Sequence, residues 1–371
     1  MKFSVYVLIL ISFFMHLRLV GINLTVYGIF FSTVFGLYFF LKYFLRQYKA
    51  PVAIASYLSI FLLIGIYNQN NFYYTIYDFV KLISLSGFFL FGYYYFKHSK
   101  RKEFLKFLHY SSRITIVLFF ITFLIVIYLW KIVEMKIYAQ VQLDLVFLVM
   151  LSMYEKKYLK LLLFLSVLSL KRMILVSVAF IFIFFTKKDK LFLLNLSIFL
   201  GFLGFLGFLG FLEKYLLTIE SVQFGALDFY SLSMAQISEL IYSVDIVRAL
   251  EFEKVVNSLS DSYIFFGDGM GGGVIQREYI DGTEVLVSFA HIVYISLIAK
   301  MGFIGLIMPL LLFLVILYKT PKSKNVLFLF LFGMVMSLFA GYIVSSWAFW
   351  LCLGAGLGNC HNVRGCKECV E

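Results

Sequence analysis

The chain has 371 residues, of which 63% are hydrophobic and 14% are charged, and its formal net charge is +12. Soluble domains carry about 25% charged residues, and long apolar runs recur along this whole chain, which excludes a soluble globular fold. The positive charge does not indicate nucleic-acid binding, because the basic residues gather in short segments between apolar runs. The sequence therefore predicts an all-α, polytopic integral membrane protein that lies in a lipid bilayer and has no nucleic-acid partner.

The apolar runs predict about twelve transmembrane helices, if about 20 residues are taken per span. The first run follows Met1 and Lys2 and lacks a small-residue cleavage site, so we expect a retained span and not a cleaved signal peptide. About nine spans form a helix bundle over residues 1–212, and a C-terminal group of helices covers 289–358. The expected spans lie near 3–20, 22–42, 52–68, 78–96, 113–131, 137–154, 158–171, 172–186, 191–212, 289–318, 326–345 and 346–358.

Lysine and arginine cluster in alternate loops between these spans. The positive-inside rule places the basic loops in the cytoplasm, together with both termini. The stretch IYNQNNFYYTIYD (66–78) has no lysine or arginine and is expected on the outer side. The basic clusters are Lys42, Arg46 and Lys49; Lys97, Lys100, Arg101, Lys102, Lys106 and Arg113; Lys156, Lys157 and Lys160; Lys187, Lys188 and Lys190; and Lys319, Lys322 and Lys324.

The segment 213–288 is the long polar segment of the chain. It holds twelve acidic and four basic residues, a charge of −8, whereas the rest of the chain is basic. The topology makes it a large extracytoplasmic loop. Within it, the apolar spacing over 237–259 predicts an amphipathic helix on the membrane surface that carries Arg248 and Lys254. An ordinary solvated charged face is the alternative reading of that helix.

Glycine dominates the stretch FFGDGMGGGV (265–274), which includes Asp268, Gly269 and Gly271. Successive backbone N–H groups in such a loop can wrap a phosphate. The stretch lacks the Gly-Lys-Ser/Thr ending of a nucleotide-binding P-loop and is expected outside the cytoplasm, where nucleotides are not supplied. Two interpretations stay open: a flexible turn between two helices, or a site for a lipid-linked diphosphate.

Several ionisable residues fall in or next to the apolar runs. His291 opens the span SFAHIVYISLIAKMGFIGL (288–306), and Lys300 lies deeper in the same span, where it needs a partner or a polar cavity. A structural hydrogen bond is the alternative role for His291. Asp78 and Lys81 are spaced to pair along one helix.

The C-terminal tail, expected over 359–371, contains the sequence CHNVRGCKEC (360–369). A Cys-x-x-Cys pair with a nearby Cys-His resembles half of a zinc site. A dispensable cytoplasmic tail is the alternative.

Two segments that follow one another along the chain together resemble a known family. DIVRALEFEKVVNSLSDSYIFFGDGMGGG (245–273) supplies an arginine, an amphipathic stretch and a glycine-rich turn, and His291, Tyr294 and the Gly302/Gly305 pair follow. This order resembles the bacterial O-antigen polymerase and O-antigen ligase family, as does SLKR (169–172). The likeness covers residues 140–310. The family often has Asn after the histidine, where this chain has Ile292, and an acidic residue where this chain has Lys300.

The resemblance implies a glycosyltransferase of the bacterial inner membrane that uses a polyprenyl-diphosphate-linked oligosaccharide. A guanidinium would stabilise the leaving diphosphate, with Arg248 ahead of Arg172 and Arg277. His291 would be the base for the acceptor hydroxyl, with Asp268 or Glu251 as the competitor. The remaining residues expected to bind substrate are Lys254, Gly269, Gly271 and Tyr294. No metal or cofactor is implied, and a chain-length regulator and a flippase of the same pathway are the expected partners.

Three functions compete on the sequence. A polymerase would join lipid-linked repeat units into O-antigen or capsular polysaccharide and is the first expectation. A ligase would transfer the finished chain to lipid A-core. A lipid-linked oligosaccharide flippase belongs to another class, and it would place its charged groups within the spans along a pathway.

Overall fold

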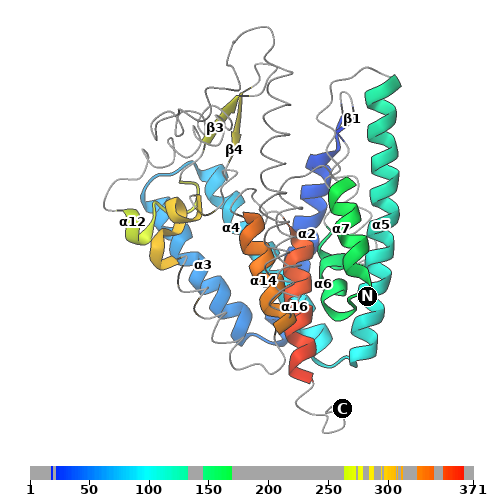
Figure 1. Cartoon of the computed structure of the whole chain (residues 1–371). Helices are drawn as coiled ribbons and strands as arrows, with labels where there is room; N and C mark the ends of the chain where they lie inside the picture. The colour runs from blue at the N-terminus through cyan, green and yellow to red at the C-terminus, as the bar shows by residue number, and fades with distance from the viewer. Residues whose placement is uncertain are drawn as a thin grey trace, which may run out of the picture.

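A computed structural model shows a bundle of helices (Figure 1). It describes residues 18–19, 22–132, 145–168, 263–272, 275–278, 284–287, 294, 296–305, 307, 311, 324–337 and 346–362. The helices are α2 (Leu24–Arg46), α3 (Lys49–Tyr67), α4 (Phe72–Lys97), α5 (Arg101–Ile132), α6 (Val146–Tyr154), α7 (Tyr158–Leu168), α12 (Tyr263–Phe266), α14 (Lys324–Ser337) and α16 (Trp347–Asn362).

Four of these helices, α2 to α5, are long and apolar enough to cross a membrane. They correspond to four of the expected spans, and the membrane class predicted from composition is thereby supported. A further apolar helix, Ser296–Gly305, falls in the span expected over 289–318. The expected total of twelve spans stays a prediction, because spans 172–186 and 191–212 lie outside the described residues.

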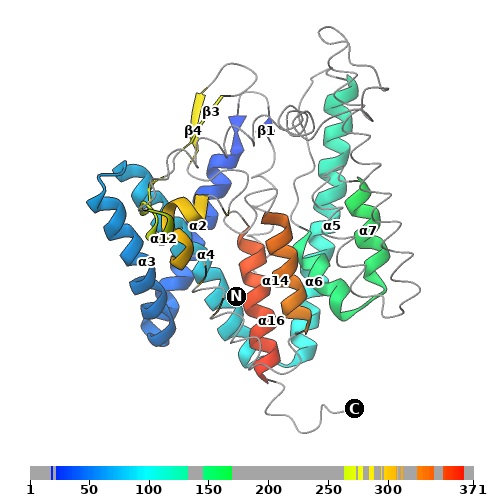
Figure 2. The same cartoon turned by 60° about the vertical axis from the view of Figure 1, so that its left-hand side comes forward.

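The basic segments come together at one end of the bundle. The α2–α3, α4–α5 and α6–α7 turns all lie at the lower end in Figures 1 and 2. These turns carry three of the lysine and arginine clusters. The α3–α4 turn, which has no lysine or arginine, lies at the other end of α3 and α4 (Figure 2). The structure thus agrees with the predicted grouping, while which end faces the cytoplasm stays a prediction.

Helix α4 is the centre of the described bundle, and it packs against α2, α3 and α16. Glycines permit the two closest approaches. A Cβ atom added at Gly354 or Gly358 would collide with the α4 backbone at Phe89 and Tyr93, and one at Gly36 would collide with Ser84. Gly354 and Gly358 are four residues apart, the spacing that lets membrane helices pack closely. No side chain separates the helices at these points, so α2 and α16 pack closely against the C-terminal half of α4.

Asn71 sets the start of α4. Its side-chain oxygen accepts hydrogen bonds from the N–H groups of Tyr73 and Tyr74 at 3.0 and 3.4 Å. Asparagine is a favoured N-cap because it satisfies N–H groups that have no partner in the first turn. This cap places Thr75 and Asp78 in the first two turns of α4, beside the end of α3.

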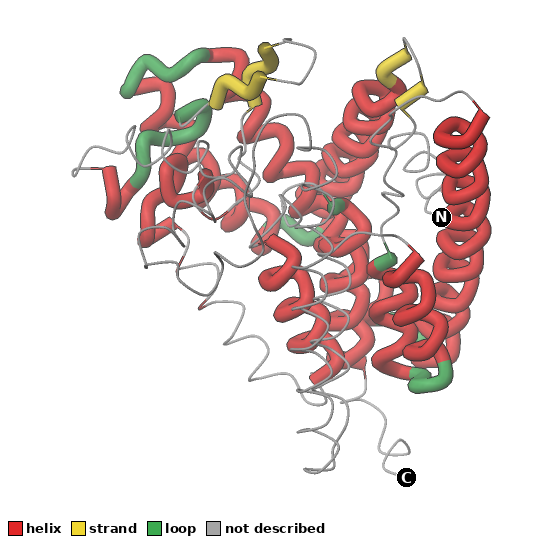
Figure 3. Tube along the Cα trace, turned by 45° about the horizontal axis from the view of Figure 1, so that its top comes forward, coloured by secondary structure: helices red, strands yellow, loops and turns green. Residues whose placement is uncertain are grey.

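Two short antiparallel hairpins accompany the helices of this all-α fold (Figure 3). Strands β1 (Arg18–Leu19) and β2 (Ile22–Asn23) form the first, inside the region expected to end one span near 20 and begin the next near 22. Strands β3 (Ile275–Glu278) and β4 (Glu284–Val287) form the second. The Asp281-Gly282 pair between β3 and β4 is typical of a hairpin turn. The expectation treated this stretch only as part of a loop.

The C-terminal boundary also differs from the expected one. The last span was expected to end near 358 and a tail to begin at 359, but α16 continues to Asn362. Cys360 is 3% exposed within that helix. Apolar packing at the end of α16 therefore includes one of the four residues considered for a zinc site, and Cys366 and Cys369 lie outside the described residues.

Candidate functional site

The glycine-rich turn is a packed element at the end of the bundle where α3 meets α4. We call residues 267–272 the glycine loop. It follows α12 and leads toward β3, and it lies against α3, the first turns of α4 and the helix Ser296–Gly305. Met270 is fully buried at its centre. The loop therefore joins three segments that are far apart in the sequence.

A buried ion pair lies beneath the glycine loop. Lys300 Nζ is 2.7 Å from Asp78 Oδ2, and the two side chains are 1% and 0% exposed. Lys300 also donates to the carbonyl oxygen of Gly272 at 2.7 Å, and Asp78 Oδ2 accepts from the N–H of Gly271 at 2.9 Å. An isolated charge is very costly inside a protein, and these mutual contacts offset that cost. The pair thus links α4, the glycine loop and the helix that carries Lys300.

This pairing answers the sequence expectation that Lys300 needs a partner. Asp78 and Lys81 are spaced to pair along α4, and Asp78 does attract Lys81 electrostatically, but its hydrogen-bonded partner is Lys300, 222 residues away. Lys300 is therefore a structural charge partner, and the acidic member of the pair is on α4.

The N–H groups of residues 268–272 in the glycine loop have acceptors within the chain. Those of Asp268 and Gly269 donate to the carbonyl oxygens of Ala299 and Lys300, at 2.7 and 3.0 Å. The N–H of Met270 donates to the carbonyl oxygen of Phe61 at 2.9 Å. The N–H of Gly271 donates to the Asp78 carboxylate at 2.9 Å, and that of Gly272 donates to the carbonyl oxygen of Gly269 at 3.2 Å. A diphosphate would have to displace these bonds to be wrapped by the same N–H groups. The structure thus gives no support to the cradle interpretation of Gly269 and Gly271.

The flexible-turn interpretation does not describe the loop either. Gly267, Gly269 and Gly271 have φ angles of +74°, +89° and +80°, which residues with a Cβ atom rarely adopt. A Cβ atom at Gly269 would collide with the backbone of Gly65 on α3, and one at Gly271 with Thr75 on α4. These glycines are required by the backbone path and by the close approach of the helices.

Asp268 is the acidic residue at the exposed side of the glycine loop. Asn68 Nδ2 donates to its carboxylate at 3.0 Å and to its carbonyl oxygen at 2.9 Å. Asn70 Nδ2 donates to the same carbonyl oxygen at 2.9 Å and to that of Met270 at 3.2 Å. Partial burial raises the pKa of Asp268 above its usual value, against the opposing effects of Asn68, Lys300 and Asn70. The site thus holds one oriented carboxylate whose proton affinity is increased.

The remaining expected site residues fall into three groups. Tyr294 donates its hydroxyl to the carbonyl oxygen of Met334 at 2.8 Å, which ties its span to α14. Arg277 lies on β3 opposite Val285. His291, Arg248, Arg172 and Lys254 lie outside the described residues, and so does Glu251.

Sequence reasoning missed Asn68, Asn70 and Thr75. All three lie in the stretch 66–78, which was noted only for its lack of basic residues. Thr75 donates its hydroxyl to Met270 at 3.1 Å. Three asparagines in the four residues 68–71 are a signal that could have been used, because a turn at a membrane surface needs side chains that satisfy backbone groups.

Among the described residues, no group of three or more His, Cys, Asp or Glu side chains is placed to hold a metal ion. Comparison of the chain with protein-family models, curated proteins and solved structures found no match. The functional argument therefore depends on the geometry of the site.

Proposed function

We propose that the protein is a polysaccharide polymerase that joins oligosaccharide repeat units carried on polyprenyl diphosphate, and that the reaction takes place beside the glycine loop. The observation that carries this proposal is the oriented, partly buried Asp268 carboxylate at the end of the membrane helices opposite the basic turns. A lipid-linked substrate would present its sugar–diphosphate bond at such a membrane end.

Asp268 is suited to act as the general base. A base must accept the proton of the acceptor hydroxyl as that oxygen attacks the anomeric carbon and the bond to the diphosphate breaks. Burial raises the pKa of Asp268, which brings it closer to the working pH. Asn68 orients the carboxylate, and the buried Asp78–Lys300 pair holds the loop that carries it. This proposal moves Asp268 ahead of His291 as the base.

The leaving diphosphate needs positive charge to stabilise it. Lys300 is engaged by Asp78 and Gly272 beneath the loop, so the proposal assigns this role to an arginine. Arg248 remains the first candidate, because a guanidinium can bind two phosphate oxygens at once. Energy for the reaction is stored in the donor bond, so the proposal requires no nucleotide.

A lipid-linked oligosaccharide transporter is the second candidate. One observation favours it: Asp78 and Lys300 are ionisable groups buried between membrane helices, which is common along transport pathways. Ligase activity toward lipid A-core uses the same donor chemistry and stays open as an alternative.

The test is a gel of surface polysaccharide from the native host. A deletion strain would be compared with strains restored by the wild-type gene, Asp268→Asn, His291→Ala and Arg248→Ala. Asp281→Asn removes the same charge from the same acidic segment and is the matched control. Membrane levels of each variant would be measured to exclude loss of protein.

A polymerase predicts cores capped by one repeat unit in the deletion strain and in Asp268→Asn, and a full ladder in Asp281→Asn. Loss of all capped cores, with long chains left on the lipid carrier, would indicate a ligase. An unchanged ladder in the deletion strain would contradict both activities. An unchanged ladder in Asp268→Asn alone would leave the polymerase and remove Asp268 as its base.

A further inference from the structure

A pocket opens at the basic end of the bundle, between the last turns of α2 and α4. Its volume is about 260 Å³, and it is lined by Lys42 and Arg46 from α2, by Gln47 directly after α2 and by His98 after α4. Tyrosines from both helices complete the lining. This pocket, called here the basic pocket, is at the opposite end of α4 from Asp78 and does not depend on the proposed function.

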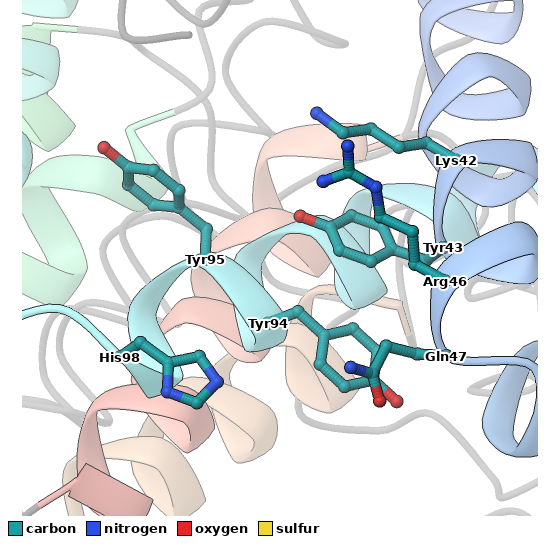
Figure 4. Close-up of a pocket in the computed structure, with 7 residues that line it drawn as sticks. All are labelled: Lys42, Tyr43, Arg46, Gln47, Tyr94, Tyr95 and His98. Carbon is teal, nitrogen blue, oxygen red and sulfur yellow. The ribbon is translucent and has the colours of Figure 1, made fainter.

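The charges of the basic pocket all have one sign. Lys42 and Arg46 extend from α2 toward α4, and His98 lies below them (Figure 4). None of the lining residues is acidic. Cations at a helix C-terminus are common, because they complement the helix dipole. Here, however, the side chains of two helices surround one cavity, and the arrangement favours an anion as the ligand.

The floor of the basic pocket is rigid and aromatic. The Tyr43 and Tyr94 rings stack with centroids 5.1 Å apart and planes 23° from parallel. Tyr43 is 8% exposed. Tyrosine hydroxyls and the Gln47 amide supply hydrogen-bonding groups around the cations. A ligand with several oxygen atoms, such as a phosphate ester, matches this lining.

The surface beside the basic pocket is apolar. Tyr38, Leu41 and Leu45 are 56%, 59% and 84% exposed on α2. They recur at intervals of three and four residues, so they lie on one helix face together with Lys42. At a rise of 1.5 Å per residue this face extends about 10 Å from Tyr38 to Leu45. An apolar strip thus borders the cationic pocket at Lys42, so an amphiphile can contact both.

The size of the basic pocket also limits its ligand. Pockets that enclose whole drug-sized molecules have volumes of about 300–1,000 Å³. A volume of about 260 Å³ suits a headgroup whose apolar chains remain outside. Membrane lipids bind in this way to basic pockets between transmembrane helices.

We propose that the basic pocket binds the phosphate headgroup of an anionic membrane phospholipid, whose acyl chains lie along the Tyr38–Leu41–Leu45 face of α2. Lys42 and Arg46 provide the charge, and His98 and the tyrosines provide hydrogen bonds. The lipid would come from the leaflet at the basic end. Its binding would hold the ends of α2 and α4 together.

The experiment measures lipids retained by the purified full-length protein in native mass spectrometry. Phosphatidylglycerol and phosphatidylcholine with the same acyl chains would be offered in turn. The test variant is the double substitution Lys42→Gln/Arg46→Gln. The matched control is Lys100→Gln/Lys102→Gln, which removes two exposed charges at the same end but outside the basic pocket.

We expect wild type and the control to retain phosphatidylglycerol over phosphatidylcholine, and the test variant to lose about ten-fold in that retention. Equal loss in the control would show a diffuse charge effect and overturn the proposal. Equal retention of the two lipids by wild type would also overturn it, without any variant having to fold.

A second arm separates a lipid headgroup from a soluble anion. Inorganic phosphate and glycerol 3-phosphate would be added at increasing concentration before the lipid. Retention of phosphatidylglycerol at millimolar phosphate supports the lipid proposal, because the acyl chains add binding energy. Displacement of the lipid at micromolar phosphate would overturn it and assign the basic pocket to a soluble phosphate compound.

Discussion

The two ends of helix α4 handle positive charge in opposite ways. Near its first turns, Asp78 neutralises the fully buried Lys300, and the glycine loop covers the pair. At its last turn, Lys42, Arg46 and His98 surround an open pocket whose lining holds no acidic residue. A buried charge requires a partner within the chain, whereas a charge at the membrane surface can be neutralised by solvent or lipid. The first end is thus built for rigidity and the second for an external anion.

The largest predicted effect tests the buried end. Lys300→Met removes the cation that is hydrogen-bonded to the buried Asp78 carboxylate and leaves only the electrostatic attraction of Lys81, so we expect the free energy of unfolding to fall by about 3–5 kcal/mol. Thermal unfolding of the purified protein in detergent would measure it. The double variant Asp78→Asn/Lys300→Met removes both charges and should recover part of the loss. If Lys300→Met were as stable as wild type, the claim that the Asp78–Lys300 pair holds the glycine loop would be contradicted.

The second prediction concerns the glycine loop. Gly271→Ala introduces a Cβ atom at a φ of +80° and against Thr75, so we expect a loss of about 1–3 kcal/mol from the backbone angle, increased by the collision. Gly272→Ala is the matched control for the backbone angle, because its φ lies outside the left-handed region while its added Cβ atom also meets a close neighbour, Asp268. Equal unfolding temperatures for the two variants would show that the backbone angle is not limiting.

The third prediction uses the pH dependence of Asp268. Because its pKa is raised in the folded protein, its contribution to stability is fully present below the unfolded pKa, near 3.8, and is lost as pH rises through the folded pKa. Asp268→Asn should lack this part of the pH dependence. The measurement is the difference in unfolding temperature between wild type and variant from pH 3 upward. A constant difference would contradict the raised pKa.

The smallest predicted effect concerns a carboxylate at the basic end. Glu155 is 2.7 Å from His109 Nε2 and 2.9 Å from Lys157 Nζ, and the hydrogen bond from Lys157 is the main cause that lowers its pKa. The Lys157 side chain is 69% exposed, so solvent screens this pair and Lys157→Ala should cost far less stability than Lys300→Met. Thermal unfolding in low and high salt would check it. A loss as large as that of Lys300→Met would remove the contrast between exposed and buried pairs.

Part of this architecture could be predicted from the sequence. Composition and apolar length indicated membrane helices, and four long apolar helices agree with that prediction. The positions of the lysine and arginine clusters predicted that the basic turns lie on one side of the membrane, and the described basic turns do lie at one end of the helix bundle. Lys300 was recognised as needing a partner, because the cost of a charge in an apolar run is a local property. The two hairpins and the extension of α16 beyond 358 were not foreseen.

The sequence by itself determined the class of the protein and the sign of charge in each turn, since both depend on residues close together in the chain. Only the tertiary structure decided that Asp78 pairs with Lys300, that the N–H groups of the glycine loop are already bonded, and that Lys42 and Arg46 share a pocket with His98. Most of these choices depend on contacts between segments separated by about 30 to more than 200 residues. Local periodicity carries no information about such distant pairs, because close packing of the helices selects them.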